Sequence, residues 1–141
     1  MRYLLDTNIL SELRKGARCD PAVAAWAQAE LMPHQGAMSV IALGEIRKGI
    51  ERIAGRDPAA AANLNDWLDG LCARFGERIL PVSAQVADEW GRLNARRPLP
   101  AADSLLAATA NVHRLILATR NTADLRQVEV KLVNPFEYRA D

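Results

Sequence analysis

The sequence predicts a single α/β domain with a mainly parallel central sheet of about five strands, covered by helices on both faces. Short apolar segments alternate along the chain with amphipathic helical segments, which is the pattern of strand–helix–strand units. The 141 residues have the size of one domain, and no Ser/Gly-rich linker or internal repeat divides them. We therefore expect one three-layer αβα domain that spans residues 1–141.

The composition is that of an ordinary globular protein without a strong net charge. Half of the residues are hydrophobic, and 18 Lys+Arg against 17 Asp+Glu give a net charge of +1, so any attraction to phosphate must be local. Cys19 and Cys72 form no Cys-x-x-Cys motif and are expected to be free thiols. No apolar run has the roughly 20 residues of a membrane helix, and no secretory pattern begins the chain, so we expect a cytoplasmic protein without membrane contact.

Five short apolar segments, each bounded by polar or turn residues, are the expected strands. The first runs from about residue 2 to residue 5 and stops abruptly at Asp6. The others are expected at 38–40, 78–82, 115–118 and 128–133.

Helix boundaries are marked by capping residues. Asp20-Pro21 and Asp57-Pro58 each place an acid at the N-cap and a proline at the first helical position. The first helix is expected to begin at Asn8 or Ser11 and to end before Gly16. Six helices are expected, at about 8–14, 21–30, 41–53, 58–74, 84–95 and 101–112.

Four acids are expected at the carboxyl edge of this sheet, where open α/β sheets bind ligands. Asp6 follows the first strand, Glu45 lies beside the apolar stripe of its helix, and Asp124 follows the fourth strand. Asp103 shares a helix face with small apolar residues at i+3, i+4 and i+7, where an inward carboxylate is costly unless a cation or hydrogen bonds satisfy it. Converging carboxylates repel one another unless a cation lies between them, so the set predicts an Mg²⁺ or Mn²⁺ site.

Each acid also has an explanation that involves no ligand. Asp6 could cap the helix that follows it, and Glu45 could be a solvated helix acid. Asp103 lies in the first turn of its helix, where the helix dipole stabilises a carboxylate by ~0.3–1 kcal/mol. Asp124 could belong to a turn or a cap. No single acid decides the question, but the four together favour a metal site with oxygen ligands over four coincidences.

Basic residues gather near these acids and could hold phosphate groups, although a solvated helix face is the simpler explanation of any one cluster. They are Arg47, Lys48, Arg96, Arg97 and Arg120. The two histidines, His34 and His113, have no partner at metal-ligand spacing and are expected to be ordinary surface residues.

The chain resembles PIN domains, and among these it is most similar to the VapC/FitB-like toxins of bacterial type II toxin–antitoxin modules. The resemblance is carried by LLDTNILSE at 4–12, SVIALGEI at 39–46, LPAADSLLAATA at 99–110, LATRNTADL at 117–125 and VNPF at 133–136. These segments span nearly the whole chain in the right order. Any one of them is weakly specific, whereas the ordered set is strongly so.

The resemblance implies an endoribonuclease that depends on Mg²⁺ or Mn²⁺ and leaves a 5′-phosphate and a 3′-hydroxyl. Asp6, Glu45 and Asp103 would form the acidic core of the site. Many relatives carry an acid where this chain has Asn121, so we take Asp124 as the fourth acid and Asn121 as a polar helper. The other polar helpers would be Thr7, Asn8 and Thr119.

The resemblance also implies partners. A VapB/FitA-like antitoxin would place its C-terminal segment in a groove beside the acids and block them, giving a hetero-oligomer. The toxin itself would be a homodimer, through helices around residues 22–30 and 59–74. The substrate would be RNA, with the five basic residues above on its flanking phosphates. Two alternatives remain: a silent PIN-fold module that binds the antitoxin but no metal, and a metal-dependent nuclease that acts on DNA.

Overall fold

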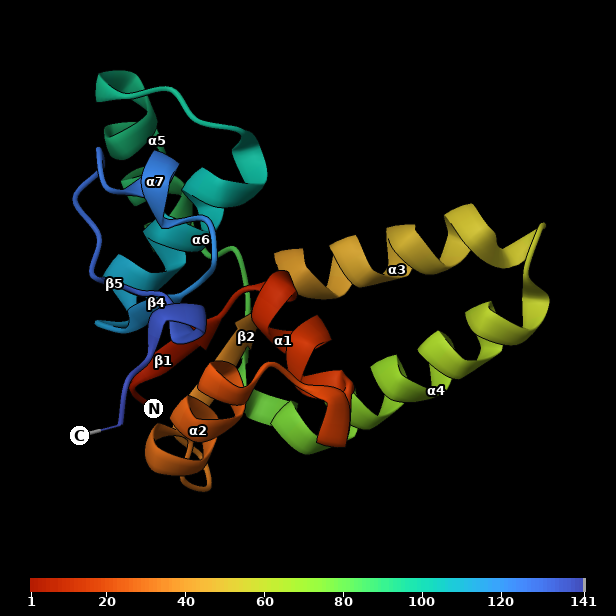
Figure 1. Cartoon of the computed structure of the whole chain (residues 1–141). Helices are drawn as coiled ribbons and strands as arrows, with labels where there is room; N and C mark the ends of the chain where they lie inside the picture. Colours follow the sequence, from red (N-terminus) through yellow and green to blue (C-terminus); the bar gives the residue numbers. More distant parts are fainter. Residues whose placement is uncertain (141) are drawn as a thin grey trace.

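Within residues 1–140, five parallel strands form the central sheet, in the order β3-β2-β1-β4-β5. The computed structural model describes residues 1–140 of the chain. The strands are β1 (Tyr3–Leu5), β2 (Gly36–Ser39), β3 (Ile79–Leu80), β4 (Ile116–Ala118) and β5 (Leu132–Val133). Helices cover both faces of the sheet, so the predicted three-layer αβα architecture is confirmed (Figure 1).

Strand β1 lies in the middle of the sheet and fixes its register. Tyr3 is opposite Gly36 of β2 on one side and Ile116 of β4 on the other, and Leu5 is opposite Ala118. Parallel strands end at the same edge of a sheet, so whatever follows β1, β2 and β4 is brought together. The backbone N–H of Asp6 extends this pairing by donating to the Ala118 carbonyl at 3.0 Å.

Residues 1–140 also contain seven α-helices and three short 3-10 segments, all but the last of which lie between strands. The helices are α1 (Thr7–Arg14), α2 (Pro21–Glu30), α3 (Val40–Ala54), α4 (Pro58–Phe75), α5 (Ala84–Arg96), α6 (Ala101–Val112) and α7 (Thr122–Leu125). The 3-10 segments are Gly16–Arg18, Gly76–Arg78 and Pro135–Glu137. The caps predicted from Asp20 and Asp57 are present, since their carboxylates accept from backbone N–H groups two or three residues later.

The clearest differences from the sequence-based expectation concern four elements. The strand expected at 78–82 pairs only over Ile79–Leu80, because Gly76–Arg78 is a 3-10 segment and Pro81 has no N–H to donate to a neighbouring strand. Helix α1 begins at Thr7, not at Asn8 or Ser11, because the Asp6 carboxylate that ends β1 is itself the N-cap. The segment expected as a long strand at 128–133 pairs only over Leu132–Val133, because Val128 and Val130 pack against the core without joining the sheet. Helix α7 was not expected, since one turn is too short to show a helical period.

The core is divided into two clusters by the sheet. Tyr3 and Leu5 face helices α1 to α4, whereas Leu4 faces helices α5 and α6, because alternate strand residues point to opposite faces. Figure 1 shows the consequence: α3 and α4 pack along each other and project from the body as a long hairpin. Within residues 1–140, no helix has the length and apolar character needed to cross a membrane.

Replacing Leu4 by alanine is expected to lower the free energy of unfolding by about 2–5 kcal/mol, because the side chain is fully buried in the central strand and leaves a cavity. Val82→Ala, at a site that is 39% exposed, is the control and should cost less than about 0.5 kcal/mol. Urea unfolding followed by circular dichroism measures both. Equal losses in the two variants would contradict the position of Leu4 in the core.

Candidate functional site

Asp6 lies at the carboxyl end of β1 and is buried. Its Oδ1 accepts the backbone N–H of Thr7 at 2.7 Å, which caps α1. Its Oδ2 accepts the hydroxyl of Thr119 at 2.7 Å and the side-chain amide of Asn8 at 3.3 Å. Three donors therefore fix the orientation of this carboxylate, and all three come from residues that the sequence analysis named as polar helpers.

The segment after β4 connects Asp6 to Asp103. Thr119 is fully buried, and its hydroxyl oxygen accepts the backbone N–H of Asn121 at 3.0 Å. The side-chain amide of Asn121 donates to Asp103 Oδ2 at 3.1 Å. Asn121 thus holds an acid from α6 in place, a role open to an amide but not to an ionised carboxylate, which can only accept.

Asp103 lies in the first turn of α6 and is partly buried. Burial raises the pKa of its carboxyl, and the negative charges of Asp6 and Asp124 raise the pKa further, while the hydrogen bond from Asn121 lowers it. Asp6 and Asp124 are therefore each within electrostatic range of Asp103. The excess of negative charge at this edge of the sheet is the kind that a bound cation relieves.

Glu45 reaches the same edge from α3. Its carboxylate accepts the hydroxyl of Thr7 at 3.1 Å, so the first residue of α1 lies between Asp6 and Glu45. Glu45 is exposed, as is Asp124 on α7. The four acids predicted from the sequence are thus brought to one edge of the sheet, two of them linked by hydrogen bonds to the end of β4.

The arrangement is open rather than a closed ligand shell. Among residues 1–140, no three His, Cys, Asp or Glu side chains lie close enough together to hold a metal ion as they stand. The donor set nevertheless fits a hard cation, since carboxylate, hydroxyl and amide oxygens are the ligands that Mg²⁺ and Mn²⁺ prefer. The negative charges of Asp6 and Asp124, which raise the pKa of Asp103, also favour a bound cation.

The predicted basic residues fall into two groups. Arg47 pairs with Glu51 at 3.9 Å and Arg96 pairs with Glu129 at 3.5 Å. Lys48, Arg97 and Arg120 are exposed, and none of the three has an ion pair within residues 1–140. The exposed pairs are weak and can exchange for a phosphate.

Arg120 is the basic residue most firmly held near the acids. Its guanidinium lies 4.3 Å from the centre of the Phe136 ring, within the range of cation–π attraction. Its backbone N–H donates to Asn8 Oδ1 at 3.2 Å, and its charge is among the causes that lower the pKa of Glu12, after the hydrogen bonds from Asp20 and Lys15. Sequence analysis assigned Phe136 and Glu12 no role at the site, although Glu12 lies one helical turn after Asn8.

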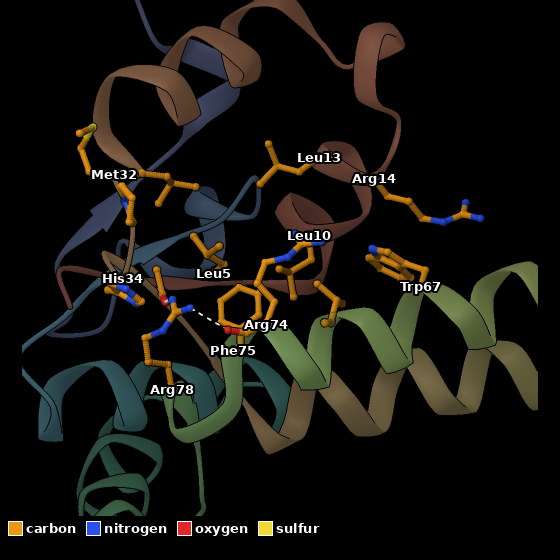
Figure 2. A pocket seen from close by; sticks show the side chains of 14 residues that line it. Leu5, Leu10, Leu13, Arg14, Met32, His34, Trp67, Arg74, Phe75 and Arg78 are labelled. Atoms are coloured by element: carbon orange, nitrogen blue, oxygen red, sulfur yellow. Dashed lines mark hydrogen bonds between the residues drawn. The ribbon is translucent and has the colours of Figure 1, made fainter.

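A cavity of about 590 Å³ lies between α1, the loop after α2 and α4 (Figure 2). Its walls are mainly apolar. Arg14 and Arg74 are exposed where they line it, whereas Arg78 is half-buried and donates to the backbone carbonyls of Gly36 and Arg74. None of the four acids lines it, but Leu5, which directly precedes Asp6, does. Sequence reasoning expected a groove beside the acids but not these walls, because they come from separate segments that only the fold brings together.

A parallel α/β domain with acids gathered at the carboxyl edge of its central strands is an arrangement typical of metal-dependent phosphoryl-transfer proteins. The model of the PIN domain family matches residues 3–131. The chain therefore belongs to the PIN domain family, and the predicted fold and family are confirmed.

Three known proteins are similar to the chain over nearly all of its length. The VapC ribonuclease Y4jK of Sinorhizobium fredii is 31% identical, over 95% of this chain and 97% of that protein. The crystal structure of FitAcB from Neisseria gonorrhoeae matches with a TM-score of 0.85 at 29% identity, over 96% of this chain and 99% of that one. A toxin–antitoxin complex from Klebsiella pneumoniae matches with a TM-score of 0.70 at 28% identity, over 94% and 97%.

Asp103→Asn is expected to raise the free energy of unfolding at neutral pH in the absence of divalent metal. The pKa of Asp103 is raised in the folded state, so the folded protein binds this proton more tightly than the unfolded chain does. That stabilisation is complete below the ordinary value of 3.8 and is lost as the pH rises through the folded-state pKa.

Urea unfolding of wild type and variant, at neutral pH and at about pH 3, measures the effect. The advantage of the variant should be present at neutral pH and shrink as the acid becomes protonated. A variant less stable than wild type at neutral pH would contradict the assignment.

Proposed function

We propose that this protein is a metal-dependent endoribonuclease and the toxin of a type II toxin–antitoxin module. The observation that carries the proposal is the convergence of Asp6, Glu45, Asp103 and Asp124 on the carboxyl edge of the sheet. The relative named a VapC ribonuclease supports the activity, and the solved toxin–antitoxin complex supports the module. Such a toxin acts in the cytoplasm, where its RNA substrates are.

The four acids would hold Mg²⁺ or Mn²⁺. A bound divalent cation supplies an activated water and stabilises charge on the phosphate oxygens. The chain contributes the orientation: Thr119 and Asn8 hold the carboxylate of Asp6, and Asn121 holds that of Asp103. Because these donors are already in place, the acids lose little freedom when ligand binds, and such supporting contacts typically affect metal affinity or activity 10- to 100-fold.

The substrate would be held mainly through its phosphates. The basic residues near the acids, led by Arg120 on its Phe136 support, would contact phosphates on either side of the scissile bond. Such contacts are salt-sensitive and blind to base sequence. Recognition of a particular RNA would then depend on its shape and on the accessibility of its loops.

The antitoxin would use the cavity beside the site. Its apolar walls fit a segment with apolar side chains, and the exposed arginines that line it, Arg14 and Arg74, fit acidic side chains on the same segment. Because Leu5 in the cavity wall directly precedes Asp6, a segment bound there can continue over the acids and block them. The protein would also form a homodimer through α2 and α4.

Replacing Asp6 or Asp103 by asparagine is expected to lower Mg²⁺-dependent RNA cleavage by about 100-fold or more, because each change removes a carboxylate from the metal site. Asp66→Asn, an exposed acid of α4, is the matched control and should cleave like wild type. Cleavage should also stop when EDTA removes the metal.

Equal activity in all four proteins would remove the catalytic role of these acids. Total inactivity of the wild type on every RNA tested would favour the silent binding module. Supplying single-stranded DNA to the same preparations separates the remaining alternative, and a clear preference for DNA would overturn the choice of substrate.

Arg74→Glu is expected to weaken binding of the antitoxin at least about 10-fold while RNA cleavage stays unchanged, since the charge is reversed at a residue that lines the cavity, and none of the four acids lines it. Arg114→Glu, another exposed arginine, is the control. Titration calorimetry with the purified antitoxin gives the affinities. Loss of affinity in both variants alike would show a general charge effect and not a role of the cavity.

A further inference from the structure

Helix α3 starts at the site and leads away from it. Ser39, at the end of β2, is its N-cap, and Glu45 is in its second turn. The helix then continues into the projecting hairpin of α3 and α4 (Figure 1). One face, with Ala42, Ile46 and Ile50, is buried, so the opposite face is free along the whole length of the arm.

That free face carries a row of cations. Lys48 and Arg52 are three and seven residues after Glu45 and thus lie on the same side of the helix. Gly55 keeps helical backbone angles at the C-cap, so Arg56 continues the four-residue spacing. We call Lys48, Arg52 and Arg56 the α3 basic stripe. From Glu45 to Arg56 it covers about 17 Å, at a rise of 1.5 Å per residue.

The cations of the stripe are available to a ligand. All three are exposed, and none forms an ion pair with a carboxylate of residues 1–140. The nearby Glu51 is already paired with Arg47. Gly44 and Gly49 flank the stripe, and a Cβ at either would meet no atom within 4 Å. Packing therefore does not require these glycines, which leave the helix surface low enough for a ligand backbone to lie on it.

We infer that the α3 basic stripe binds the sugar–phosphate backbone of the RNA strand beyond the point of cleavage. The inference rests on the proposed function, because the strand must pass the acids before it reaches Lys48. The charge of the stripe is complementary to a polyanion, and the stripe is continuous with the site through Glu45. A regular row of point charges without aromatic residues holds phosphates and does not read bases.

The test is RNA binding by the full-length protein in EDTA, so that no cleavage occurs. The variant combines Lys48→Gln, Arg52→Gln and Arg56→Gln, and the probe is a labelled mixed-sequence single-stranded RNA of about 16 nucleotides. Each lost phosphate contact lowers the magnitude of the slope of log K against log salt by about 0.7. The slope of the variant should therefore be smaller in magnitude by about 2, and the variant should bind RNA at least about 10-fold more weakly.

Two further variants serve as controls. Arg2→Gln, Arg114→Gln and Lys131→Gln together remove the same charge from exposed residues at the opposite, amino edge of the sheet, and should leave the slope nearly unchanged. The combination of Lys48→Arg, Arg52→Lys and Arg56→Lys keeps the charge and should bind RNA like wild type.

A slope and affinity in the stripe variant that equal those of the amino-edge control would overturn the inference, as would a wild type that binds no RNA. Cleavage in Mg²⁺ is measured separately on the same proteins. Wild type that binds RNA through the stripe but never cleaves it would overturn the proposed nuclease and leave the stripe standing. Wild type that cleaves RNA without any dependence on the stripe would overturn the role of the stripe and leave the proposed nuclease standing.

Discussion

The parallel pairing of β1 with β2 and β4 is the constraint on which the site depends. It makes three chain segments end at one edge, so that Asp6, the start of α3 and Thr119 become neighbours although they are far apart in sequence. The hydrogen bond from Thr119 to Asp6 then joins the ends of β1 and β4. Because Thr119 is fully buried, this contact is protected from water, and the rest of the polar network is built outward from it.

The same network concentrates like charge. Burial and the fields of Asp6 and Asp124 raise the pKa of Asp103, so the protein holds an acid where an ionised carboxylate is unfavourable. Asn121 offsets this in part, which an aspartate at that position could not do without adding charge. A site that keeps such repulsion gives up some stability of the free protein and gains affinity for a cation, a balance common at functional sites.

Much of this could be predicted from the sequence where the signal is local. Asp20 before Pro21 fixes the start of α2 because the cap and the proline act within one turn, and the bounds of α6 followed from Pro100 and the apolar face after Asp103. Sequence-based prediction of the elements failed where one residue belongs to two elements or where an element is very short. Asp6 both ends β1 and caps α1, and α7 has a single turn. The cavity and the link from Asn121 to Asp103 depend on distant segments, which no local pattern encodes.

The two roles of Asp6, as helix cap and as site residue, determine which mutant alleles at this position can be selected. Oδ1 caps α1 while Oδ2 belongs to the acidic edge, so almost any mutation of the codon damages folding and the site together. Asparagine keeps the cap, because it is as good an N-cap as aspartate. Selection for cells that escape such a protein would therefore recover two kinds of allele at this position: stable full-length protein from the Asn change, and poorly accumulating protein from the others.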